Sequence, residues 1–210
     1  MKWRNWSGAV RISPAEIAKP QTEVEVASIL RAAAERGRRV RPVGAGHSFT
    51  PLVATDDMLL SLEKLSGLVS ANPFTGDVTL LGGTRIRDIA GLLAPFGLAL
   101  PNMGDIDAQT IAGAISTGTH GTGLGYTGYS GIVTGLRLAL PDGSVREPSD
   151  NDETFQAARV GLGVMGVVTA VSLRCVPAFN LECVETTEPI EHVLDSYLER
   201  SRAADHLEFF

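Results

Sequence analysis

The segment Gly44-Ala45-Gly46-His47-Ser48 decides how the rest of this sequence is interpreted. It follows residues 40–43, a short segment bounded by Val40 and Val43 that is predicted to be a β-strand, and it carries little side-chain bulk. Successive backbone N–H groups at the end of a strand can bind a phosphate or a pyrophosphate. The segment therefore predicts a phosphate-binding loop, although a short Gly-x-Gly also occurs in loops that bind nothing.

Two common nucleotide-binding motifs do not fit this loop. The dinucleotide pattern Gly-x-Gly-x-x-Gly needs a glycine at position 49, and the sequence has Phe49 there. The P-loop pattern needs Gly-Lys-Ser or Gly-Lys-Thr, which the sequence lacks. A nicotinamide-binding dehydrogenase domain is therefore disfavoured.

A second glycine-rich segment, residues 111–123, reads IAGAISTGTHGTG. Its small residues let the backbone lie flat against a large planar ligand, while its hydroxyl and N–H groups reach the polar edge of that ligand. Taken alone, this segment is also compatible with a glycine-rich surface loop. The two segments together favour a long, partly planar, phosphate-containing ligand.

Helices and strands alternate irregularly around these segments. Thr22 and Glu25 have the spacing of a capping box, and the apolar residues behind them recur at helical spacing up to Gly37. Further helices are expected from Thr84 to Pro95 and over 111–115. Strands are expected over 10–12, 40–43, 58–62, 78–81, 136–140 with a hairpin partner from 145, and 167–176. Because no regular βαβ repeat is present, the predicted fold class is α+β.

Composition excludes several classes of protein. The net charge is −6 and the basic residues are scattered, so no nucleic-acid surface is expected. The longest apolar stretch, residues 160–173, is too short and too rich in glycine for a transmembrane segment. No cluster of histidine, cysteine and carboxylate has metal-binding spacing, so no metal is expected. The N-terminus lacks the apolar run of a signal peptide, which leads us to expect a cytoplasmic location.

The order and spacing of the two glycine-rich segments resemble the FAD-binding domain of the vanillyl-alcohol-oxidase (PCMH) type. Within that superfamily the sequence is similar to the sugar-lactone and alditol oxidases, such as the arabinono- and gulono-1,4-lactone oxidases, over about residues 10–176. The resemblance implies an FAD-binding domain over 1–177, with two subdomains of about 1–75 and 76–177. Residues 178–210 would begin a truncated substrate domain, most of which is missing from this sequence.

The resemblance also implies a set of FAD-binding residues. The pyrophosphate loop would comprise Pro42, Val43, Gly44, Ala45, Gly46, His47 and Ser48. His47 would be joined covalently to the flavin 8α-methyl group, the alternative being a loop histidine that only hydrogen-bonds a phosphate. Val168 would contact the adenine. The isoalloxazine and the ribityl chain would be lined by Asp105, Thr110, Gly113, Thr117, Gly118, Thr119 and His120.

The implied reaction is oxidation of a secondary alcohol of a sugar lactone or polyol. A hydride would pass to flavin N5, and the electrons then to oxygen or another acceptor. Gly104 aligns with a position that gates oxygen, where the lack of a Cβ implies an oxidase; the alternative is that Gly104 only permits a tight turn after Asn102. Relatives are about twice as long, so a second hypothesis is a non-catalytic FAD-binding fragment, or a split-gene module that needs a partner chain.

Overall fold

The N-terminal part of the protein is built on a small parallel sheet. The computed structural model describes residues 1–148 and 152–210. The sheet has the order β3-β5-β4, with bounds Glu16–Ala18, Met58–Ser61 and Val40–Val43. The strand predicted over 40–43 is thereby confirmed, and its carboxyl end leads directly into residues 44–48.

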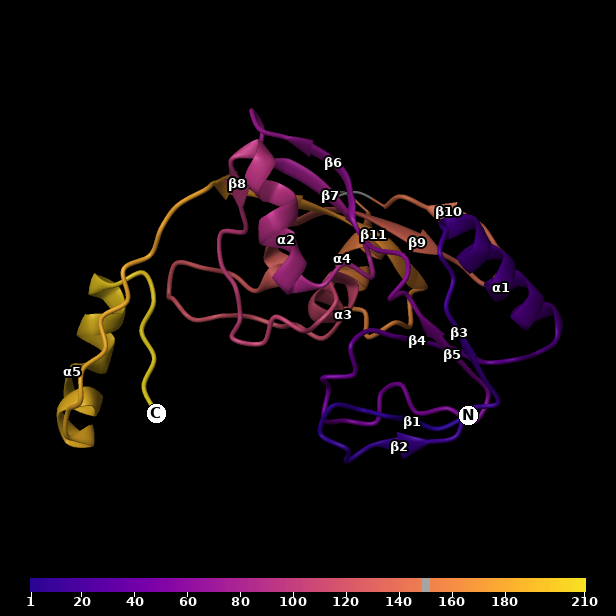
Figure 1. Ribbon diagram of the computed structural model, residues 1–210, viewed down its shortest axis with the longest axis horizontal. Helices are drawn as coiled ribbons and strands as arrows, with labels where there is room; N and C mark the ends of the chain where they lie inside the picture. The colour runs from indigo at the N-terminus through magenta and orange to yellow at the C-terminus, as the bar shows by residue number, and fades with distance from the viewer. Residues whose placement is uncertain (149–151) are drawn as a thin grey trace.

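Helix α1 (Glu23–Glu35) connects β3 to β4 and packs beside the sheet (Figure 1). The Thr22 hydroxyl accepts a hydrogen bond from the Glu25 N–H at 3.1 Å, as the capping-box spacing predicted. The Glu25 carboxylate accepts from the Gln21 N–H at 2.7 Å, one residue earlier than in the standard box. Gly37, with a φ of +64°, follows the helix in the left-handed conformation expected of a helix terminus.

A five-stranded antiparallel sheet carries the rest of the fold. Its order is β10-β9-β11-β7-β6, with bounds Val145–Arg146, Val133–Ala139, Val167–Arg174, Asp77–Leu81 and Leu68–Asn72. Helices α2 (Ile86–Leu93), α3 (Ile111–Ser116) and α4 (Glu153–Ala158) contribute buried side chains to the main core on this sheet. The mixture of a parallel and an antiparallel sheet with interspersed helices confirms the α+β prediction.

Two parts of this sheet differ from the sequence prediction. Strand β6 was not predicted, and its pairing with β7 places residues 68–72 in the larger sheet. The strand predicted over 167–176 is divided at Cys175, because β12 (Val176–Pro177) pairs with β8 (Leu98–Ala99) instead. The subdomain division at about residue 75 stays a proposal.

A second buried cluster connects the two sheets. It combines Val26 and Leu30 of α1 with Leu60 of β5, Ala139 of β9 and Val167 of β11. The two sheets are therefore held together by apolar burial, which fixes the positions of the loops that lie between them.

The C-terminal helix α5 (Ile190–Ala203) lies to one side of both sheets (Figure 1). Most of its side chains are exposed. Of the helices in the described ranges, none has the length and apolar character needed to cross a membrane.

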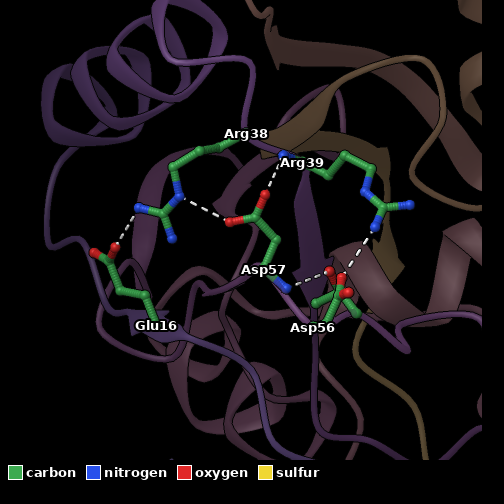
Figure 2. A network of polar contacts seen from close by, with 6 residues as sticks. Glu16, Arg38, Arg39, Asp56 and Asp57 are labelled. Atoms are coloured by element: carbon green, nitrogen blue, oxygen red, sulfur yellow. Dashed lines mark hydrogen bonds and ion pairs between the residues drawn. The ribbon is translucent and has the colours of Figure 1, made fainter.

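A polar network joins the segments at the amino ends of the three parallel strands (Figure 2). Asp57 accepts hydrogen bonds from the Arg38 Nε at 2.8 Å and the Arg39 backbone N–H at 2.7 Å, and Arg38 also contacts Glu16 at 2.7 Å. The Arg39 backbone N–H and the Arg38 guanidinium together lower the pKa of Asp57. The network therefore stabilises the fold while Asp57 is ionised.

We expect Asp57→Asn to lower the melting temperature by about 2–4 °C at neutral pH. Because the pKa of Asp57 is lower in the folded state than in the unfolded state, its contribution is present above about pH 4 and is lost as the pH falls through the folded pKa. The difference between variant and wild type should therefore disappear in acid. Asp56→Asn is the control, since the Asp56 side chain is 85% exposed. An equal effect of both substitutions in thermal unfolding would contradict the prediction.

Candidate cofactor-binding cleft

A cleft lies where the end of β4, the start of α3 and the segment before β11 meet. The structure brings most of the predicted binding residues to this cleft. Those that line it are Pro42, Val43, Gly44, Ala45, Gly46, His47, Ser48, Thr110, Gly113, Thr117 and Val168. Two segments far apart in the sequence thus line one cavity and contact each other.

The loop over residues 44–48 lines this cleft and carries unpaired backbone donors. Within the described part of the chain, none of its five N–H groups donates a hydrogen bond to another protein group. Half-buried backbone N–H groups normally have partners, and a run of free ones forms a concave anion site. The arrangement suits a phosphate or pyrophosphate.

Glycine is required at two positions of the loop by close approach of neighbouring groups. A Cβ at Gly44 would lie 2.6 Å from Thr110 Oγ1, because the loop packs directly on the first turn of α3. Gly46 has a φ of +73°, and a Cβ there would lie 3.0 Å from the Trp3 ring. The close packing of the loop on α3 and on the N-terminal segment therefore depends on the absence of side chains at Gly44 and Gly46.

The N-terminal segment contacts the loop through hydrogen bonds and ring stacking. These contacts were not predicted from the sequence. The Trp6 N–H donates to the Gly46 carbonyl at 2.8 Å, and the Asn5 amide donates to the Ser48 carbonyl at 2.9 Å. The Trp6 ring stacks on His47 with 5.4 Å between ring centroids. Both loop carbonyls are turned toward the N-terminal segment and its strand β1 (Trp3–Arg4), whose partner is β2 (Arg11–Ile12). The two tryptophans among the first six residues were the available signal.

The start of α3 also lines the cleft. The Thr110 hydroxyl accepts from the Gly113 N–H at 3.2 Å and caps the helix, while the Thr117 hydroxyl donates to the Gly113 carbonyl at 2.9 Å. Gln109 also lines the cleft and was not predicted. Its Nε2 donates to Thr119, and its Oε1 is buried without a hydrogen-bond partner among the described residues. A buried polar atom of this kind normally has a hydrogen-bond partner, so Gln109 Oε1 is available to a group bound in the cleft.

Five predicted residues do not line this cleft: Gly104, Asp105, Gly118, Thr119 and His120. Gly104 lies where two loops approach each other. Its N–H donates to the Tyr129 hydroxyl at 3.2 Å, and a Cβ at this position would lie 2.8 Å from the His120 carbonyl oxygen. This approach alone accounts for a glycine at 104, so the oxygen-gating role stays a prediction, as do the roles of the other four.

Charged side chains do not contribute to the cleft. Its lining, among the residues described, includes no lysine, arginine, aspartate or glutamate. Across ranges 1–148 and 152–210, no group of three or more histidine, cysteine or carboxylate side chains is placed to hold a metal ion. An anionic ligand in this cleft would therefore be bound by backbone dipoles rather than by ion pairs.

Comparison with known proteins agrees with this geometry. Residues 14–149 match the family described as "FAD binding domain". The chain is 39% identical over 208 residues to L-gulono-1,4-lactone dehydrogenase of Mycobacterium tuberculosis, covering 99% of this chain and 48% of that protein. It is 33% identical over 213 residues to L-gulonolactone oxidase of Bos taurus, and this match covers 100% of this chain and 48% of that protein. The chain spans about half the length of these curated relatives.

One solved structure shares the fold. A histidine-to-alanine variant of cholesterol oxidase from Brevibacterium sterolicum superposes with a TM-score of 0.74, at 24% sequence identity. The match covers 84% of this chain and 37% of the other. At this identity the likeness concerns the arrangement of the helices and strands.

Proposed function

The chain belongs to the FAD binding domain family, and from this premise we propose that its cleft binds FAD with the pyrophosphate on the N–H groups of residues 44–48. The observation that carries the proposal is the run of unpaired donors in that loop. The glycine contacts and the buried Gln109 oxygen also fit a bound cofactor, since both indicate space and polarity for a ligand. Val168 is proposed to contact the adenine.

His47 is proposed to carry the flavin through a covalent bond to the 8α-methyl group. His47 lines the cleft at the end of the loop that Trp6 and Asn5 hold in place. A stacked ring loses less freedom when it reacts, because its orientation is already restricted. Thr110, Gly113 and Thr117 are proposed to lie along the ribityl chain and the flavin ring.

The complete protein is proposed to oxidise a secondary alcohol of a sugar lactone or polyol, because the similar proteins are named for lactone substrates. When bound, FAD supplies the chemistry by accepting a hydride, and oxygen or another acceptor then receives the electrons. The residues of this chain bind and orient the cofactor. A cytoplasmic location, expected from the sequence, belongs to the same proposal.

A second candidate is an FAD-binding segment that does not turn over substrate by itself. The observation favouring it is that the chain spans about half the length of its curated relatives. The two candidates share the cofactor and differ in activity on sugar lactones.

One set of measurements tests both candidates. The purified protein is incubated with FAD, its visible absorbance spectrum is recorded, and the bound cofactor is identified by mass spectrometry. A panel of aldonolactones and polyols is then assayed with a dye as electron acceptor. A protein that binds no FAD contradicts the proposal, whereas bound FAD without turnover selects the second candidate.

Salt should have little effect on FAD binding. Because the cleft lining contains no lysine or arginine, the pyrophosphate gains no ion pairs that salt could screen. We expect the dissociation constant of reversibly bound FAD to change less than about threefold between low and moderately high ionic strength. Titration of the apoprotein by flavin fluorescence measures this, and a steep loss of affinity with salt would contradict the proposed binding mode.

A further inference from the structure

The turn before β11 contains an unusual residue. The Val164 N–H donates to the Gly161 carbonyl at 2.9 Å, and the two residues between them have positive φ angles, +50° at Leu162 and +78° at Gly163. Two positive φ angles are typical of a type I′ turn, whose first central position favours asparagine, aspartate or glycine. Leucine is a poor choice there, because its Cβ crowds the backbone in the left-handed region.

Leu162 is the one residue other than glycine with a positive φ in the described ranges. Its side chain does not explain this conformation through core packing. It belongs to neither buried cluster, and the residue is 49% exposed. Backbone strain that core burial does not offset is characteristic of ligand-binding sites.

Leu162 lines the cofactor cleft. Its N–H donates to the Ser116 carbonyl at 3.2 Å, which holds the turn against the end of α3. A Cβ at the next residue, Gly163, would lie 2.9 Å from Pro42 Cγ. The turn therefore packs closely on the end of β4, just before the loop. The turn is thus fixed to two walls of the cleft.

The position of Leu162 along the cleft indicates which part of a ligand it meets. Pro42, which lies in β4 just before the loop, packs on the turn. Trp6 contacts His47 near the far end of the loop. If the pyrophosphate lies between these ends and the flavin lies toward His47, the adenosine half would lie on the Pro42 side of the turn that contains Leu162. Two apolar residues that also line the cleft, Pro42 and Val168, suit the flat face of a purine ring.

We propose that Leu162 is a specificity residue that contacts the adenine of FAD and retains a strained backbone conformation for that purpose. The inference rests on the proposed binding of FAD in this cleft. It predicts opposite effects of one substitution: relief of strain in the apoprotein and loss of affinity for the cofactor.

The test compares Leu162→Asn and Leu162→Gly with Val164→Ala, all in a His47→Ala background so that flavin binding is reversible. Val164 lies in the same turn, is 73% exposed and does not line the cleft. FAD and FMN, which lacks the adenylate, are titrated against each apoprotein. We expect both Leu162 variants to bind FAD about 10-fold more weakly, with FMN binding changed less than about twofold. The Val164 variant should match its background.

Thermal unfolding of the apoproteins separates a binding role from a structural one. The Leu162→Asn apoprotein should melt at the same temperature as its background or higher, because asparagine accommodates a positive φ. Unchanged FAD binding, an equal loss for FMN, or a lower melting temperature of the Leu162→Asn apoprotein would each overturn the inference. If the unsubstituted protein binds no FAD, the proposed function itself fails, which is a different result from bound FAD that is insensitive to Leu162.

Discussion

Valine in place of Gly44 is expected to leave the protein without bound FAD. A Cβ at this position would lie 2.6 Å from Thr110 Oγ1 and 3.6 Å from the Gly113 Cα, and valine adds two methyl groups to that contact. The loop must then separate from α3, which changes the positions of the N–H groups of residues 44–48 in the cleft. We expect FAD affinity to fall by more than about 100-fold, because the loss includes both the donors and the shape of the cleft.

Flavin content after reconstitution with FAD measures this effect. Gly91→Val is the matched control, since no atom lies within 4 Å of a Cβ built at Gly91, an exposed position of α2. Gly118→Val is a second comparison: Gly118 has a φ of +69° and does not line the cleft, so the flavin content of this variant tests the predicted role of Gly118 separately from that of Gly44. Normal flavin loading in a folded Gly44→Val protein would show that the cofactor binds elsewhere.

The features that could be predicted from the sequence are those determined by local chemistry. The capping spacing of Thr22 and Glu25 identified α1, and the short segment from Val40 to Val43 followed by glycine identified β4 and its loop. Such signals depend on residues that are only a few positions apart in the sequence. They can therefore be recognised without knowledge of the fold. The hairpin around Gly143 is of the same kind.

The remaining features depend on contacts between distant segments. Strand β6 is short and forms only by pairing with β7, so its own residues carry little signal. Asn5 and Trp6 reach the loop across about forty positions of sequence, and nothing local indicates that they do. The left-handed turn at Leu162 also escaped prediction, because leucine is not a residue that favours it.

The second glycine-rich segment shows the limit of motif reasoning. From its first half, Ala112, Gly113, Ser116 and Thr117 line the cleft. At Gly118 the φ of +69° redirects the chain, and the following residues pack against the loop around Gly104 instead. One run of similar small residues therefore belongs to two parts of the fold, the cleft and the packing around Gly104. The sequence does not indicate the boundary between these two parts.

Replacement of His47 by alanine is expected to abolish covalent flavin and to retain reversible FAD binding. The imidazole is the side chain in the cleft lining that we propose bonds to the flavin, so its loss removes the attachment entirely. The backbone donors of residues 44–48 do not depend on the histidine side chain, and the contacts of Asn5 and Trp6 with the loop carbonyls also remain. Affinity for FAD should therefore fall by no more than about 10-fold.

His120→Ala is the matched control, because His120 is also flanked by small residues and glycine but lies outside the cleft. Acid precipitation should release the flavin from the His47→Ala protein and leave it on the wild-type and His120→Ala chains, where intact mass spectrometry should find the added mass of FAD. Complete release from the wild type would refute the covalent bond, and flavin retained on the His47→Ala chain would assign the bond to another residue. Weak reversible binding by the His47→Ala protein, far below the wild-type loading, would mean that the histidine rather than the backbone loop provides most of the affinity.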